Sequence, residues 1–149
     1  MSTVILRHAP QAFPNLAITP LNPTFAALVE NIDLSREQSE HTIDLIRHAL
    51  VQHKLLVFRG QRITPAQQRD FAARFGPLHV HPLLNHDDDL KEIIVLNYDR
   101  SRPPEKDEWH TDVTFIETPP LGSILYGAVI PETGGLFLRA WSHLALSSP

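Results

Sequence analysis

The 149-residue sequence contains no cysteine. This absence excludes disulfides, thiolate nucleophiles, iron–sulfur clusters and cysteine-based zinc sites, so histidine, carboxylates or water must hold any metal. The sequence also lacks an apolar run of the ~18 residues that suggest a membrane span. Its start lacks the basic-then-apolar order of a secretory signal. We therefore expect a cytoplasmic protein with no membrane partner.

The sequence also contains fewer basic than acidic residues. Thirteen Lys and Arg face 17 Asp and Glu, which gives a net charge of -4 and a pI near 6.1. This balance argues against a nucleic-acid partner. The hydrophobic fraction of 42% and the charged fraction of 20% are typical of a globular protein. A chain of this length suits one compact domain.

Two helices are predicted in the first half of the chain. The first covers Ser39 to Gln52, because Ile43, Ile46 and Leu50 fall on one helical face.

The second helix begins after Thr64, which can cap it and form a capping box with Gln67, while Pro65 suits the first helical position. Phe71 and Phe75 lie one turn apart and should face the core. The sequence Gly76–Pro77 should stop this helix.

Short strands are predicted around these helices and after them. Their ranges are Leu16–Ile18, Phe25–Val29, Lys54–Phe58 (as a buried strand), Ile93–Leu96, Glu108–Phe115 and Leu121–Ile130. Two early helices followed by strands and prolyl turns predict an α+β, mainly β fold.

The chemistry concentrates at His110 and Asp112. Alternate side chains of a strand share a face, so a strand here would point this imidazole and this carboxylate the same way. One histidine and one carboxylate are two members of the 2-His-1-carboxylate triad that binds Fe(II). A His-x-Asp triplet alone is weak evidence, because an exposed pair that hydrogen-bonds to water is the commoner case.

The surrounding sequence makes the triplet more specific. The string Trp-His-Thr-Asp-Val-Thr-Phe-Ile-Glu-Thr-Pro-Pro resembles the signature of the taurine dioxygenase (TauD/TfdA) family of Fe(II)- and 2-oxoglutarate-dependent dioxygenases. The similarity extends roughly from Leu16 to Gly135. Further motifs at matching spacing are Ile63–Pro65, Arg74–Gly76, His79–Pro82 and Glu92–Leu96.

The resemblance implies a double-stranded β-helix, or jelly roll, that binds Fe(II) through His110 and Asp112. It implies oxidative decarboxylation of 2-oxoglutarate by dioxygen, coupled to substrate hydroxylation. By the same resemblance His81 contacts the substrate, and Val113 and Phe115 lie beside its pocket. Alternatives remain for each: His81 could be a solvated edge residue, as could His79, and the other two could be core residues.

Two substitutions within the resemblance bear on the substrate. Leu84 stands where taurine dioxygenase has a tyrosine, and Lys106 stands where it has an asparagine. Losing two polar contacts makes taurine itself a doubtful substrate. Another sulfonate, a sulfate ester or a carboxylate fits equally well.

The end of the chain departs from the family. Leu136 and Phe137 replace an Asp-Thr pair whose threonine contacts 2-oxoglutarate, so residues 136–149 form a divergent tail, best explained by a local sequence shift. The family places its distal iron-binding histidine and its keto-acid-binding arginine beyond Pro149, and His143 reads as a surface residue. We therefore expect the amino-terminal part of a dioxygenase domain, an incomplete jelly roll with no assigned co-substrate residue.

Two functions of other classes compete with this interpretation. One is a catalytically inactive fragment that pairs through exposed strand edges with an intact paralogue. The same edges could instead pair two copies of this chain and form a homo-oligomer. The other is a non-redox metal-binding protein. It would use His79, His81, His110 and Asp112.

Overall fold

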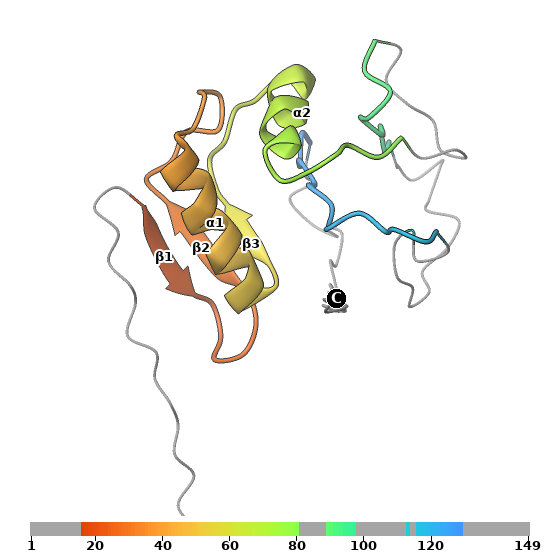
Figure 1. Cartoon of the computed structure of the whole chain (residues 1–149). Coiled ribbons are helices and arrows are strands. Elements are labelled where there is room, and N and C mark those ends of the chain that lie inside the picture. Colours follow the sequence, from red (N-terminus) through yellow and green to blue (C-terminus); the bar gives the residue numbers. More distant parts are fainter. Residues whose placement is uncertain (1–15, 81–88, 98–112, 114–115, 130–149) are drawn as a thin grey trace, which may run out of the picture. The chain divides into compact units, whose positions relative to one another are not determined.

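The computed structural model describes residues 16–80, 89–97, 113 and 116–129 (Figure 1). The chain divides into two compact units, and each is described by itself. Described residues up to Ile63 belong to the first unit, and those from Thr64 onward belong to the second.

A three-stranded mixed sheet forms the centre of the first unit, in the order β1-β2-β3. The strands are β1 (Ala17–Pro20), β2 (Ala27–Glu30) and β3 (Leu56–Phe58). β1 pairs with β2 antiparallel, whereas β2 pairs with β3 parallel. A parallel pair needs a crossover connection, and helix α1 (Glu40–His53) supplies it across one face of the sheet (Figure 1).

Both ends of α1 carry recognisable caps. At its start the Ser39 hydroxyl accepts a hydrogen bond from the backbone N–H of Thr42 at 3.2 Å. At its end Lys54 adopts a left-handed conformation, with φ of 67°, and its N–H donates to the carbonyl of Leu50 at 2.7 Å. The helix predicted over 39–52 is thereby confirmed.

The core of this unit lies where α1 and β2 contribute buried side chains. Ala27 and Val29 are buried on β2, while Ile43, Ile46 and Ala49 are buried on α1.

Two predicted burials differ from the structure. Leu50, expected on the buried face, is half-buried, since Ala49 takes the interior position. β3 is also half-buried throughout, because it forms an edge of the sheet with β2 as its neighbour. The strand predicted over Lys54–Phe58 is therefore confirmed at Leu56–Phe58, whereas its predicted burial was wrong.

Gln61 joins the loop after β2 to the end of β3. Its side-chain oxygen accepts a hydrogen bond from the backbone N–H of Leu34 at 2.8 Å. Its side-chain nitrogen donates to the carbonyls of Ile32 at 3.0 Å and Arg59 at 3.1 Å. One amide therefore satisfies three backbone groups that the sheet leaves outside its ladder.

Helix α2 (Pro65–Ala73) opens the second unit. Its predicted capping box is confirmed: Gln67 N–H donates to the Thr64 hydroxyl at 3.2 Å, and Thr64 N–H donates to the Gln67 side chain at 2.8 Å. Phe71 is buried, and its ring meets that of Phe75 edge to face, with centroids 5.2 Å apart.

Two predicted strands of the second unit are absent from its described residues. Of the run from Ile93 to Leu96, Ile94 alone forms an isolated bridge. Residues 121–129 form no strand, and all nine are exposed. An apolar run becomes a strand only when another strand accepts its backbone hydrogen bonds, and sequence cannot show whether that partner is present.

Helices and a mixed sheet make the described part an α+β structure. The jelly roll stays a prediction. Neither helix of this part combines the length and the apolar character needed to cross a membrane.

Candidate active site

Most of the predicted site residues lie outside the described residues. This group comprises both predicted iron ligands and four of the predicted substrate contacts: His110, Asp112, His81, Leu84, Lys106 and Phe115. The arrangement of the pair at 110 and 112 on one strand face therefore stays a prediction.

Val113 is the predicted site residue that the structure describes. It is half-buried and its φ is 54°, in the left-handed region. The backbone N–H of Ile116 donates to the Val113 carbonyl at 3.4 Å and closes a local turn. A strand needs a φ near -120°, so the strand predicted over Glu108–Phe115 was wrong at this position.

The conformation of Val113 is costly, because a β-branched side chain in the left-handed region crowds its own backbone. Neither hydrophobicity nor strand propensity indicates such a residue. The sequence therefore gave no sign of the turn that directly follows Asp112.

Helix α2 is joined to the segment that follows the His110–Asp112 motif in sequence. The side-chain nitrogen of Gln68 donates a hydrogen bond to the carbonyl of Ile124 at 3.0 Å, across 56 residues of chain. The capping box at Thr64 fixes the first turn of the helix that carries Gln68. Sequence reasoning missed this anchor, because no spacing rule links residues so far apart.

His79 lies on irregular chain between α2 and the undescribed residues 81–88. Residues 77–80 form no strand, so His79 does not lie on a strand edge. The His79 side chain is half-buried, and its Nε2 atom is shielded from solvent. This placement does not fit the solvated edge histidine considered as an alternative.

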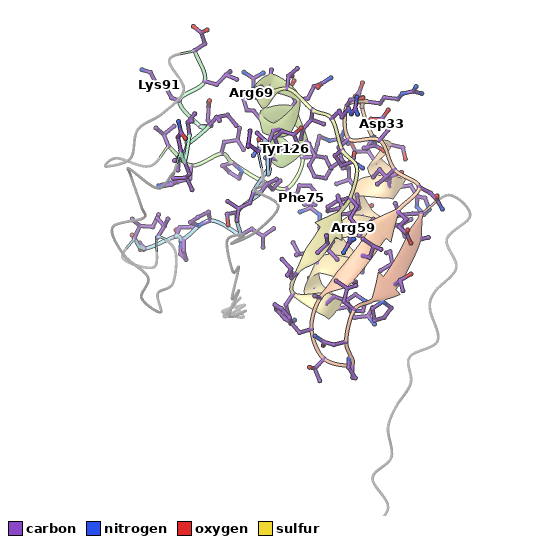
Figure 2. All side chains as sticks on the ribbon, turned by 180° about the vertical axis from the view of Figure 1, so that it is seen from behind. Asp33, Arg59, Arg69, Phe75, Lys91 and Tyr126 are labelled. Atoms are coloured by element: carbon purple, nitrogen blue, oxygen red, sulfur yellow. The ribbon has the colours of Figure 1, made fainter. Side chains whose placement is uncertain are left out.

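A charged pair lies on the exposed side of α2. The guanidinium of Arg69 donates to the carboxylate of Asp70 through Nε at 2.9 Å and through an Nη at 2.6 Å. These hydrogen bonds, with the negative charge of Asp70 and then of Glu92, raise the pKa of Arg69 (Figure 2 labels it). The pair is accessible to solvent, so its contribution to stability is small.

The described residues hold no cluster of three or more histidine and carboxylate side chains able to bind a metal. The metal-binding protein predicted from His79, His81, His110 and Asp112 stays untested, since three of these four lie outside the described residues. A neutral imidazole and a carboxylate at 110 and 112 are the ligand types that non-haem Fe(II) prefers.

Comparison with known families gives a match over most of the chain. The model of the family described as "Taurine catabolism dioxygenase TauD, TfdA family" matches residues 17–138. The match contains the whole string from Trp109 to Pro120.

The chain is also similar to curated proteins. The chain is 39% identical over 121 residues to an alkylsulfatase of Acinetobacter baylyi, which covers 80% of this chain and 38% of the relative. It is 35% identical over 136 residues to an alpha-ketoglutarate-dependent sulfate ester dioxygenase of Pseudomonas putida. That match covers 91% of this chain and 44% of the relative. It is 30% identical over 139 residues to an alpha-ketoglutarate-dependent 2,4-dichlorophenoxyacetate dioxygenase of Cupriavidus pinatubonensis. That match covers 81% of this chain and 48% of the relative.

The chain thus spans less than half the length of each of these relatives. Among solved structures, it is similar to a taurine dioxygenase from Burkholderia xenovorans, at 32% identity and a TM-score of 0.49. That alignment covers 52% of this chain and 28% of the other.

Proposed function

Because the chain belongs to the taurine catabolism dioxygenase TauD, TfdA family, we propose that its residues form the amino-terminal part of an Fe(II)- and 2-oxoglutarate-dependent dioxygenase domain. The observation that carries this proposal is the family match over residues 17–138, which includes the His110–Asp112 motif. Residues 136–149 are proposed as a divergent tail. The names of the relatives give no added support to an inactive strand-pairing module.

His110 and Asp112 are the proposed iron ligands. The imidazole and the carboxylate would occupy two positions of a facial triad, and bound Fe(II) would supply the site where dioxygen and 2-oxoglutarate react. Val113, which follows Asp112 in the sequence, has a φ of 54°, which is not a strand conformation. No residue of this chain is assigned to 2-oxoglutarate.

The proposed substrate is a sulfate ester, with an alkyl sulfonate as the related second choice. Support comes from the alkylsulfatase and the sulfate ester dioxygenase that the chain resembles. The residue types at positions 84 and 106 support the same substrate. Leu84 and Lys106 replace two polar residues of taurine dioxygenase, and Leu84 suits an apolar organic group better than the amine of taurine. His81 is proposed to donate a hydrogen bond to the sulfur oxyanion, with Val113 and Phe115 beside the organic group.

The overall reaction balances without any further oxidant. One oxygen atom of dioxygen enters succinate as 2-oxoglutarate loses carbon dioxide. The other hydroxylates the substrate carbon that bears the sulfate group, and this carbon then becomes an aldehyde as inorganic sulfate leaves.

A chimera provides the test. Residues of this chain replace the matched segment of the Pseudomonas putida sulfate ester dioxygenase, and succinate and sulfate are measured with Fe(II), 2-oxoglutarate and an alkyl sulfate. We expect both products in equal amounts. His110→Ala and Asp112→Ala should each abolish them, because a metal ligand is lost.

His41→Ala is the matched control, since His41 is an exposed histidine on α1. It should leave the rate unchanged. A chimera that is folded by circular dichroism but forms no more succinate than its His110→Ala variant would refute the proposal.

A further inference from the structure

One side chain of helix α2 is bonded to the backbone of a distant segment in the same unit. The side-chain nitrogen of Gln68 donates a hydrogen bond to the carbonyl of Ile124 at 3.0 Å. Ile124 lies in the 121–129 segment, whose nine residues are all exposed. Exposed side chains contribute little apolar burial, so a hydrogen bond to the backbone is a larger share of what holds this segment in place.

The helix that carries Gln68 is a well-ordered support for this bond. Its capping box joins Thr64 and Gln67 by hydrogen bonds in both directions. Phe71 on the same helix is buried, and its ring packs edge to face against that of Phe75, which Figure 2 labels. The bond from Gln68 therefore holds the Ile124 backbone against an element that is fixed at its start and by its buried face.

The chain between Val113 and Ile124 has restricted backbone freedom. The backbone N–H of Ile116 closes a turn onto the Val113 carbonyl at 3.4 Å. Pro119 and Pro120 follow, and each proline ring locks the φ angle of its own residue. A turn and two prolines reduce the number of free rotations along this stretch. A displacement of Ile124 is therefore passed on to Val113.

We propose that Gln68 is a positioning residue for the substrate, because it fixes the chain on which Val113 lies. The inference rests on the proposed function, in which Val113 lies beside the organic group of an alkyl sulfate. Val113 is half-buried with a φ of 54°, and a strained residue of this kind keeps its place only when the chain around it is held. In this role Gln68 acts through the backbone and makes no contact with the substrate.

The bond is tested first on the 149-residue protein without iron, 2-oxoglutarate or substrate. Gln68→Met keeps the length of the side chain and a high helix propensity, but removes the N–H donor. Chymotrypsin cleaves after Tyr126, which is 39% exposed, and such cleavage follows the population in which the segment has opened. We expect Gln68→Met to speed this cleavage by about twofold to tenfold, the effect of losing one hydrogen bond.

The positioning role is tested by kinetics in the chimera with the Pseudomonas putida relative. Gln68→Met should raise the KM for an alkyl sulfate by about twofold to tenfold and leave the KM for 2-oxoglutarate unchanged. The sulfate released per succinate should fall, because a displaced substrate is hydroxylated less often per 2-oxoglutarate consumed. Gln68→Lys keeps N–H donors and should restore both values. A residue that only stabilised the fold would lower kcat and leave this ratio unchanged.

Gln52→Met is the matched control, because Gln52 is an exposed glutamine on α1. It should change neither the cleavage rate nor either KM. An unchanged cleavage rate for Gln68→Met would overturn the inference, as would an unchanged KM for the alkyl sulfate in an active chimera, or equal effects of the two methionine variants. A folded chimera that is inactive with Gln68 intact would instead refute the proposed function, and the cleavage rates would still report on the bond to Ile124.

Discussion

At the scale of single residues, Lys54 ends helix α1 in a backbone conformation that is unfavourable for a residue with a Cβ atom. Its left-handed φ of 67° ends α1, where glycine is the usual residue. We expect Lys54→Gly to raise the free energy of unfolding by about 0.5–1 kcal/mol, since the Cβ crowding disappears. Urea denaturation measures this.

Lys54→Ala is the control for that substitution. It keeps the Cβ atom and removes the hydrogen bond from Nζ to the Val51 carbonyl. It should bring no gain in stability, and a gain equal to that of the glycine variant would contradict the backbone argument.

Asp33, in the loop after β2 (Figure 2), titrates below its ordinary range. The Ser35 hydroxyl, then the Ser35 backbone N–H, and to a lesser extent Arg36, lower the pKa of Asp33. Because the folded pKa lies below the unfolded one, ionised Asp33 stabilises the fold above about pH 4, and this contribution is lost as the pH falls through the lowered pKa.

The order of these causes can be measured by NMR titration of the Asp33 carboxyl. Ser35→Ala should raise its pKa more than Arg36→Ala does, although Arg36 is the ion-pair partner at 3.1 Å. A larger rise with Arg36→Ala would show that charge dominates over hydrogen bonding at this loop.

At the scale of the elements, α2 depends on its capping box. Thr64→Ala removes the acceptor for the Gln67 N–H and should cost about 1 kcal/mol of stability. Thr64→Ser keeps the hydroxyl and should cost much less. Thermal unfolding followed by circular dichroism compares the two, and similar losses would argue against the hydroxyl as the source.

The two helices were predicted correctly from local signals, and the strands predicted over Leu16–Ile18, Phe25–Val29 and Lys54–Phe58 are found as β1, β2 and β3. Ser39 and Thr64 stand at helix starts, and the Gly76–Pro77 stop follows α2, so each boundary is set within a few residues. The run from Ile93 to Leu96 and the 121–129 segment failed as strands because strands depend on a distant partner. The β-propensity of a segment shows that its residues suit a strand, but it does not show whether a second strand is available to pair with it.

At the scale of the whole molecule, stability of the first unit depends on a few fully buried side chains. Ile46 on α1 is 2% exposed, and Ile46→Ala should lower the free energy of unfolding by about 2–5 kcal/mol through the cavity it leaves. Val51→Ala is the control on the same helix. Val51 is 43% exposed, so the loss should stay within about 0.5 kcal/mol.

Such a difference is readily visible in chemical denaturation, because small domains have only about 5–15 kcal/mol of net stability. Equal losses for Ile46→Ala and Val51→Ala would contradict the assignment of the core to the inner face of α1.

The candidate site was predictable only as a list of residues. His110 and Asp112 follow from ligand chemistry and from the string around them, whereas their arrangement lies outside the described residues. The left-handed turn at Val113 and the bond from Gln68 to Ile124 could not be predicted, because one requires a rare backbone conformation and the other spans 56 residues. Neither is encoded in a local pattern.

The parallel pairing of β2 and β3 through α1 also bears on synthesis. Ala27 pairs with Leu56, and the buried residues of the first unit lie between Leu16 and Ala49. All of these precede Trp109 in the chain, and amino-terminal regions generally fold first as a polypeptide emerges from the ribosome. The sheet and its helix can therefore be complete while the proposed iron ligands, His110 and Asp112, are still being translated.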